Sequence, residues 1–492
     1  MPFRLTTLAV AAVLILFSTS CGEHPENEPQ KPINKLKVEY FWSTASNTYG
    51  YASIKAGVRA ALEETEKEKA ENSEAFRLLD YVQFEDREDP ESQEKAEEIA
   101  RRIRRDPDVL AIIGHAASGT TFAALPHYAE AGIPVLITSA TSPYLLYRHR
   151  FELNTTSLST SELGDSRAKF SNAFRLIPSD VPDQAHAMEL TIKDRSKSRP
   201  VAKPKKKARV LLICDGTKGS GAQIYSKPIC DYLAEPGNRK EGNFDVVGRT
   251  DIDKLEVSSI LPEIHATHPD FIVVASYSSL ARLVLQVWVE DKEKRSKAAE
   301  SDPEFIMSDA CLSSVLLKFD ANIFVTYPMN PDHIRECTSR DRYLNGIDCQ
   351  KQMQLNPSLT KCSDLRESND QQLANTKAPD TFKNKQLEPG IPETDEMFGY
   401  DSVLILKQAV KECVAEQDLN RGCVTRYLTQ HHDDLKGICE TYRVEHGDRQ
   451  NAYYYVYKNS HDRVEEKSKW QVIGFAKEDD HELNRAASPT GR

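Results

Sequence analysis

The sequence lacks the patterns that mark several common functional classes. Beyond its N-terminal segment it has no run of roughly 18 apolar residues, so the rest of the chain is not expected to cross a membrane. Its 64 Lys and Arg residues are outnumbered by 75 Asp and Glu residues, and the net charge of −11 argues against nucleic acid as a partner. No CxxC or HxxxH spacing favours a zinc site. We therefore expect neither a metal nor a cofactor.

Enzymatic patterns are also missing. Gly114 and Gly119 have the spacing of a P-loop, but Thr120 stands where the phosphate-contacting lysine would be. No G-x-S-x-G elbow frames Ser118, so we interpret the neighbouring His115 as a structural residue rather than a catalytic base. The chain is not expected to be an enzyme.

The N-terminal segment has the layout of a secretory signal. An early arginine precedes the apolar run Leu8–Phe17, and small residues then lead to Cys21. This resembles the lipobox of bacterial lipoproteins, although Ser18 stands where leucine is usual. We expect residues 1–20 to be a signal peptide and residues 21–35 a disordered tether. The protein would then be exported and held on the extracytoplasmic side of the bacterial cell envelope by a lipid on Cys21. A plain cleaved signal and an uncleaved anchor stay open.

Ten cysteines are compatible with an oxidising compartment. Cys413 and Cys423 flank a short polar loop between two helical stretches and are a possible disulfide. Cys214 ends an apolar strand and is the best candidate for a buried free thiol. The other pairings cannot be derived from spacing.

One stretch of sequence predicts a βαβ unit. Val109–Ile113 is expected to form a buried strand, a helix is expected from Ser118 to Gly132, and a second strand follows Pro134. Ligands of parallel sheets bind beyond the carboxyl ends of the strands, where helix N-termini present free amides. Small hydroxyl residues, Ser118 and Thr141, stand at both strand ends. The unit therefore predicts a cradle for a small, partly anionic ligand.

The alternation of strands and helices continues in two successive sets, with breaks near Ser179 and Tyr327. The fold class is therefore α/β, with two lobes that are each a parallel sheet sandwiched by helices and are joined by crossover strands at a hinge. Later helices and strands have to pack on these lobes. The expected divisions are lobe 1 at 36–178 and 329–436, with a polar cysteine-containing insertion at 330–394, lobe 2 at 179–328 and 437–476, and a disordered tail at 477–492.

The order of elements resembles the type 1 periplasmic binding proteins, specifically the leucine/isoleucine/valine-binding branch, also called the extracellular ligand-binding receptor family. The resemblance covers most of residues 35–475. The motifs that carry it are Ile113-Gly114-His115 with Ser118, Ala131–Pro134, Ser139–Pro143, Phe174-Arg175, Ser179-Asp180, Pro269-Asp270, Tyr400-Asp401, Gly447-Asp448 and Trp470. It implies a solute-binding protein that captures a small amino-acid-like ligand in an interlobe cleft by hinge closure, with an ABC permease as a possible partner.

The resemblance also implies a first-lobe site. The ligand α-carboxylate would meet the Ser118 hydroxyl and the amides of the helix start, which includes Gly119. Thr141 and the Ala140 carbonyl would complete the site, and Tyr49 could cover the ligand.

From the second lobe, the resemblance gives Tyr277 as an aromatic contact and Asp309 as the partner of the ligand ammonium. Asp309 could equally cap the following helix, and Tyr277 could be ordinary packing. Gly219–Gly221 stands where the family has an aromatic wall, so one contact is in doubt. The alternative function is a ligand-sensing or scaffold lipoprotein of the same fold that binds a protein partner. The polar insertions favour that alternative, whereas the intact Ser118 and Thr141 argue against it.

Overall fold

The computed structural model describes residues 36–43, 54, 57–59, 61–62, 79–86, 92–146, 170–198, 207–217, 221–237, 239, 244–294, 302–328, 394–437, 441–445, 447–450, 452–462, 467–477, 480 and 482–485. The predicted signal peptide, the tether with Cys21, Tyr49 and the insertion up to residue 393 lie outside the described residues. Within the described ranges, no helix combines the length and apolarity needed to span a bilayer.

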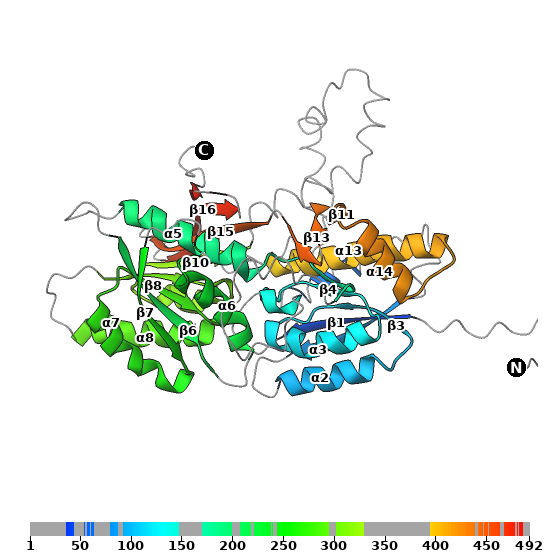
Figure 1. Cartoon of the computed structure of the whole chain (residues 1–492), viewed down its shortest axis with the longest axis horizontal. Helices are drawn as coiled ribbons and strands as arrows, with labels where there is room; N and C mark the ends of the chain where they lie inside the picture. The colour runs from blue at the N-terminus through cyan, green and yellow to red at the C-terminus, as the bar shows by residue number, and fades with distance from the viewer. Residues whose placement is uncertain are drawn as a thin grey trace, which may run out of the picture. The chain divides into compact units, whose positions relative to one another are not determined.

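The first lobe is built on a five-stranded parallel sheet with the order β2-β1-β3-β4-β5 (Figure 1). Its strands are β1 (Leu36–Ser43), β2 (Leu79–Asp86), β3 (Val109–Ile113), β4 (Val135–Ile137) and β5 (Ala173–Arg175). Helices α2 (Ser92–Ile103) and α3 (Ser118–Glu130) contribute to the apolar cluster on one face. Helices α13 (Thr394–Ala415) and α14 (Arg421–Gln430) contribute to the cluster on the other face. The sheet is thus sandwiched, as predicted.

The predicted βαβ unit is confirmed as β3, α3 and β4. All five residues of β3 are buried, as its unbroken apolar run requires. Helix α3 begins at Ser118. The chain turns just after this helix at Gly132, whose φ of +63° is a low-energy conformation only for glycine.

The second lobe is built on an eight-stranded sheet with the order β17-β16-β15-β10-β9-β8-β6-β7. Its strands are β6 (Ala208–Asp215), β7 (Phe244–Ile252), β8 (Phe271–Ala275), β9 (Glu304–Met307), β10 (Ile323–Tyr327), β15 (Tyr453–Asp462), β16 (Lys467–Lys477) and β17 (Asn484–Arg485). The strands β6 to β10 are parallel, whereas β15, β16 and β17 join antiparallel. The predicted parallel sheet is confirmed by β6 to β10, and the later strands extend it with an antiparallel edge, because β15 and β16 follow one another closely and pair as a hairpin.

Helices cover both faces of the second sheet. Buried residues of α5 (Ala185–Ser198) and α6 (Ala222–Ala234) form one apolar cluster, and those of α7 (Ile260–Thr267) and α8 (Ser278–Lys294) join another. The short helices are η2 (Pro143–Leu145), η3 (Asp180–Gln184), η4 (Lys254–Ser259), η5 (Asp309–Cys311) and η6 (Ser314–Lys318). The regular helix α5 begins only at Ala185, after η3, in which Val181 is extended (φ −134°, ψ 127°).

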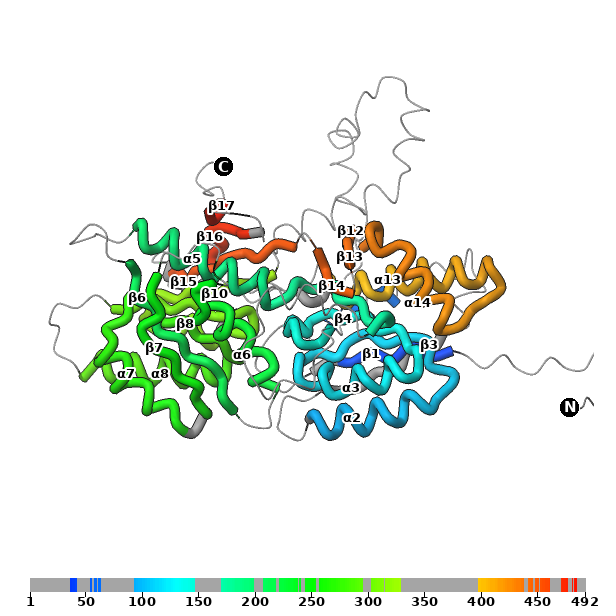
Figure 2. Tube along the Cα trace, viewed as in Figure 1, coloured from blue at the N-terminus to red at the C-terminus, as the bar shows by residue number. Residues whose placement is uncertain are grey.

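The late strands differ from the predicted division in two places. The short pairs β11 (Leu435–Lys436) with β12 (Thr441–Tyr442) and β13 (Val444–Glu445) with β14 (Asp448–Arg449) contact first-lobe elements, α13 and β5. Of these strands, β11 lies in the range expected for lobe 1, whereas β12, β13 and β14 lie in the range 437–476 expected for lobe 2. The expected disordered tail contains β17, which pairs with β16 (Figure 2), and Leu483 beside it is buried. Apolar burial explains why this part of the tail is ordered.

Cys214 is not a free thiol. It forms a disulfide with Cys230 of α6, and Cys413 is paired with Cys423, both at 2.04 Å between sulfurs. The physical reason is that Cys214, near the end of β6, lies against the helix that follows this strand, and the spacing of the cysteines in the sequence does not reveal that contact. Among the described cysteines the free thiol is Cys311, which is buried, and burial raises its pKa to about 12.

Candidate functional site

The first-lobe candidate residues gather at the carboxyl ends of β3 and β4. Ser118, Ala140 and Thr141 are all buried, and the backbone amide of Ser142 donates to the Ser118 Oγ at 3.3 Å. The predicted pair of hydroxyl residues therefore meets at one edge of the sheet. The Thr141 carbonyl accepts from the Asp180 amide at 2.9 Å, which joins this edge to the crossover into the second lobe.

His115 is held by packing contacts. Its ring stacks on Phe41, with centroids 3.7 Å apart, and its Nε2 lies 2.9 Å from the Tyr128 hydroxyl. These contacts lie inside the first lobe. They are consistent with the structural role inferred for His115.

The second-lobe candidates form an aromatic and acidic cluster. Tyr277 stacks on Tyr225 of α6, with ring centroids 5.0 Å apart and planes 16° from parallel. The Tyr225 hydroxyl donates to the Asp309 carboxylate, which also accepts from the Ala310 amide at 2.8 Å. Asp309 is the first residue of η5 and does not cap it, because the N-cap residue is Ser308, which makes no side-chain cap hydrogen bond. Tyr277 does pack against Tyr225. Neither contact tests a ligand role.

A second carboxylate lies near Asp309. Asp180, at the start of η3, is fully buried, and neither of its oxygens accepts a hydrogen bond of normal geometry from the described residues. Burial and the nearby charge of Asp309 raise the pKa of Asp180 well above its usual range, while Thr141 and Arg175 act in the opposite direction. Burial also raises the pKa of Asp309, against the hydrogen bond from Tyr225. Two buried acids that destabilise each other's charged forms make a place where a cation would be stabilised.

Arg175 does not neutralise this pair by direct contact. Its guanidinium donates to Asp448 at 2.8 and 2.9 Å and to the carbonyls of Thr141 and Ser142 at 2.9 and 2.7 Å. These four bonds position the strand-end segment rather than the acids. Within the described residues, neither Asp180 nor Asp309 takes part in an ion pair.

Sequence reasoning missed three side chains of this cluster. Asp180 was part of a noted motif but was not proposed as a site residue, and Tyr225 and Tyr454 were not singled out. Tyr454 is buried, its hydroxyl has no partner among the described residues, and the charges of Asp309 and Asp180 help to raise its pKa. The sequence did contain a possible signal for Tyr225. Gly219–Gly221 stands where the family has an aromatic residue, and Tyr225 supplies an aromatic ring one helical turn further along the chain.

One group of possible metal ligands exists in the described part of the chain: Glu416, Asp418 and Cys423. Cys423 is already bound to Cys413, and Arg426 pairs with both carboxylates at 2.7 and 3.2 Å. The group is therefore better explained as a surface ion-pair cluster than as a metal site.

Neither the family models nor the curated proteins give a match to this chain. Solved structures do match, and they define its fold as the two-lobed fold of the periplasmic solute-binding proteins of ABC transporters. One is an ABC transporter substrate-binding protein from Desulfitobacterium hafniense in complex with Leu, with a TM-score of 0.54, 16% identity, and coverage of 89% of this chain and 100% of that one. A leucine-binding protein from Thermotoga maritima has a TM-score of 0.55 and 13% identity, and the match covers 89% of this chain and 97% of that one. A solute-binding protein from R. palustris in complex with benzoate has a TM-score of 0.57 and 13% identity, and the match covers 93% of this chain and 98% of that one.

Proposed function

We propose that this chain is an extracytoplasmic solute-binding protein that captures a small amino-acid-like ligand between its lobes by hinge closure, for an ABC transporter. The observation that carries the proposal is the buried pair Asp180 and Asp309, which lacks a described cation partner and is linked through Thr141 to the first-lobe strand ends. The shared fold is consistent with this function but does not identify the ligand.

The chemistry of the two sides suits a zwitterion. An anion at the start of α3 would gain on the order of 0.3–2 kcal/mol from the helix N-terminus, and the Ser118 hydroxyl and Gly119 amide would orient it. An ammonium against Asp309 would supply the missing positive charge, with Ala140 and Thr141 as further contacts. Tyr277 would pack against the ligand, and Tyr49 would cover it.

Export and anchoring are part of the same proposal. A lipid on Cys21 and the two disulfides would fit a protein on the extracytoplasmic side of the bacterial cell envelope, where thiols can oxidise. No enzymatic step is needed for this role.

The test is a thermal-shift and calorimetric screen of the purified chain against amino acids and small carboxylates. A ligand that binds only the folded state raises the melting temperature. We expect an amino acid to do so, and Ser118→Ala and Asp309→Asn each to weaken its binding at least about tenfold, the effect of losing one charge-assisted contact. The exposed Asp320→Asn is the matched control and should bind normally.

The proposal would be wrong if no amino acid or small carboxylate shifted the melting temperature of well-folded protein. That result would favour the scaffold alternative. Binding that survives both site variants would instead place the ligand elsewhere in the molecule.

A further inference from the structure

Helix α6 contains a proline that leaves one backbone carbonyl without its helical partner. Pro228 lies inside the helix, and a proline has no amide hydrogen to donate to the carbonyl four residues earlier. That carbonyl belongs to Ile224. An unused carbonyl in the middle of a helix is an acceptor that another part of the molecule can take.

The first lobe supplies the donor. The Ser142 hydroxyl donates to the Ile224 carbonyl at 2.7 Å, although the two residues belong to different lobes. Ser142 directly follows the candidate ligand residue Thr141, and its amide is bonded to Ser118. The hydrogen bond between the lobes therefore starts from the segment that forms the candidate site.

On the same side of α6, Gly221 at the start of this helix contacts Gly119 of α3 in the first lobe. A Cβ built on Gly221 would lie 2.7 Å from the Gly119 Cα and 2.9 Å from its nitrogen, so only glycine permits this approach. Further along the helix, burial and the charge of Asp231 raise the pKa of Tyr144, a side chain of the first lobe. Gly221, Ile224, Pro228 and Asp231 follow the spacing of one helical face. That face is the surface that α6 presents to the first lobe.

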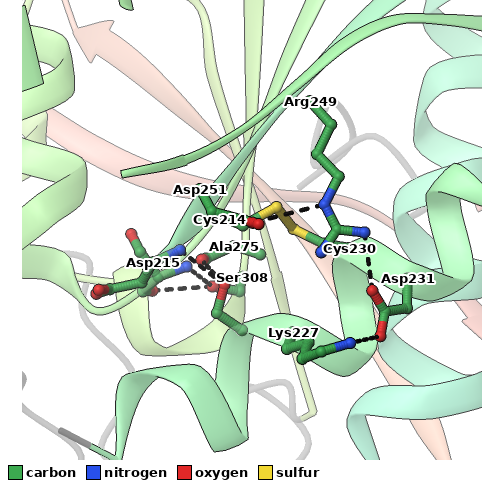
Figure 3. The surroundings of a disulfide bond; sticks show 11 residues. Cys214, Asp215, Lys227, Cys230, Asp231, Arg249, Asp251, Ala275 and Ser308 are labelled. Carbon is green, nitrogen blue, oxygen red and sulfur yellow. Dashed lines mark hydrogen bonds and ion pairs between the residues drawn. A yellow bond between two sulfur atoms is a disulfide. The ribbon is translucent and has the colours of Figure 1, made fainter. Parts of the chain in front are cut away.

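Helix α6 is fixed firmly to its own lobe. The disulfide from Cys230 ties it to β6, and Asp231 bonds to Arg249 of β7 at 2.8 Å (Figure 3). The Ser226 hydroxyl accepts from the Asp215 amide at 2.8 Å and donates to the Ala275 carbonyl at 2.6 Å. A contact made by the first turns of α6 is thus transmitted to the whole second sheet.

We propose that the Ser142–Ile224 hydrogen bond and the Gly119–Gly221 contact form a latch that stabilises the closed arrangement of the lobes, and that Pro228 is the positioning residue that keeps its acceptor free. The effect of the latch on ligand affinity rests on the proposed function, in which the lobes close around the ligand and a less stable closed form lowers the apparent affinity. The effect of the latch on the separation of the lobes does not rest on the proposed function.

The test compares three variants of the purified full chain by small-angle X-ray scattering, without ligand. Pro228→Ala restores the amide that would occupy the Ile224 carbonyl. Gly221→Val inserts a side chain between the lobes, and its φ of −62° suits any residue, so the helix itself is not strained. Pro126→Ala makes the same proline replacement in α3 and is the control.

We expect a larger radius of gyration for Pro228→Ala and Gly221→Val and an unchanged one for Pro126→Ala, with circular dichroism confirming the fold of each. Pro228→Ala should lower the ratio of closed to open molecules by about fivefold, the effect of one net hydrogen bond. Where a ligand is known, its apparent affinity should fall by up to the same factor. Equal radii for the wild type and Gly221→Val would overturn the latch, and opening by Gly221→Val alone would overturn the role of Pro228. If no ligand is found, the proposed function fails while the scattering result still decides the latch.

Discussion

At the scale of single residues, the buried charges of this protein differ in whether they are neutralised. Arg175 has no exposed surface and finds a carboxylate and two carbonyls. Glu39 on β1 is only 5% exposed, and its Oε2 has no hydrogen-bond partner among the described residues. Burial raises the pKa of Glu39 to about 7 from its ordinary value near 4.5, and the charge of Arg102 only partly opposes this. The ionised form of Glu39 therefore destabilises the fold.

This gives a prediction about pH. Because the folded-state pKa of Glu39 is raised, wild-type stability should be greatest below pH 4.5 as far as this group is concerned, and it should fall as the pH rises toward 7. The variant Glu39→Gln has no such titrating group. Its free energy of unfolding should exceed that of the wild type by about 2–3 kcal/mol at pH 8 and differ little from it at pH 4.5. Urea unfolding at both pH values measures it. A constant difference between the two proteins would contradict a titrating Glu39.

Residue types at strand ends could be predicted from the sequence, and their partners could not. Ser118 and Thr141 were identified because small hydroxyl residues follow two apolar strands. Tyr225 and Asp180 join the cluster only because α6 and the crossover bring them beside Asp309. That arrangement depends on contacts between segments far apart in the chain, which local patterns do not contain.

At the scale of elements, most strands and helices were predictable because their apolar runs are clear. The strand Phe271–Ala275 is predictable from the sequence, since it is a run of five apolar residues that follows Pro269-Asp270. The attachment of helix α6 to β6 is not predictable in this way. Attachment requires two cysteines to face each other across a strand and a helix, and only the fold decides that.

The disulfide between β6 and α6 leads to a second prediction. Replacing both Cys214 and Cys230 by alanine should lower the free energy of unfolding by about 3 kcal/mol, because a bridge that closes a loop of this length restricts the unfolded chain by that amount. Peptide mapping without reductant should first recover the two cysteines in one linked fragment. If both react with a thiol reagent in unreduced, unfolded protein, the bridge does not form and the stability argument no longer applies.

At the scale of the whole described unit, late segments return to early ones. Asp448 reaches back to Arg175 across 273 positions of the chain, and the Gly447 carbonyl accepts from the Arg175 amide at 2.8 Å. These contacts explain why β13 and β14 stay with the first lobe although they were assigned to the second. An ion pair over such a separation cannot be predicted from one sequence, so local patterns do not assign the late strands to a lobe.

The Arg175–Asp448 pair therefore allows a third prediction. Asp448→Ala would leave a fully buried guanidinium without its carboxylate, which should destabilise the protein by about 3–5 kcal/mol. The exposed Asp320→Ala, which also removes a carboxylate near a cation, should cost less than about 1 kcal/mol. Thermal unfolding of both variants makes the comparison. Similar losses in the two would mean that the buried pair contributes no more than a surface contact.

The carbonyl freed by Pro228 also bears on how easily the lobes could separate. A carbonyl has two lone pairs, and one that accepts from its own helix has a single lone pair left for another donor. The Ile224 carbonyl has no helical donor from Pro228, so both lone pairs are open to Ser142 or to solvent. When Ser142 leaves, a solvent molecule can take its place with nearly the same bond energy, so the exchange is close to balanced. In the proposed latch, Pro228 thus lets α6 gain and lose its hydrogen bond to the first lobe without a change in its own helical hydrogen bonds.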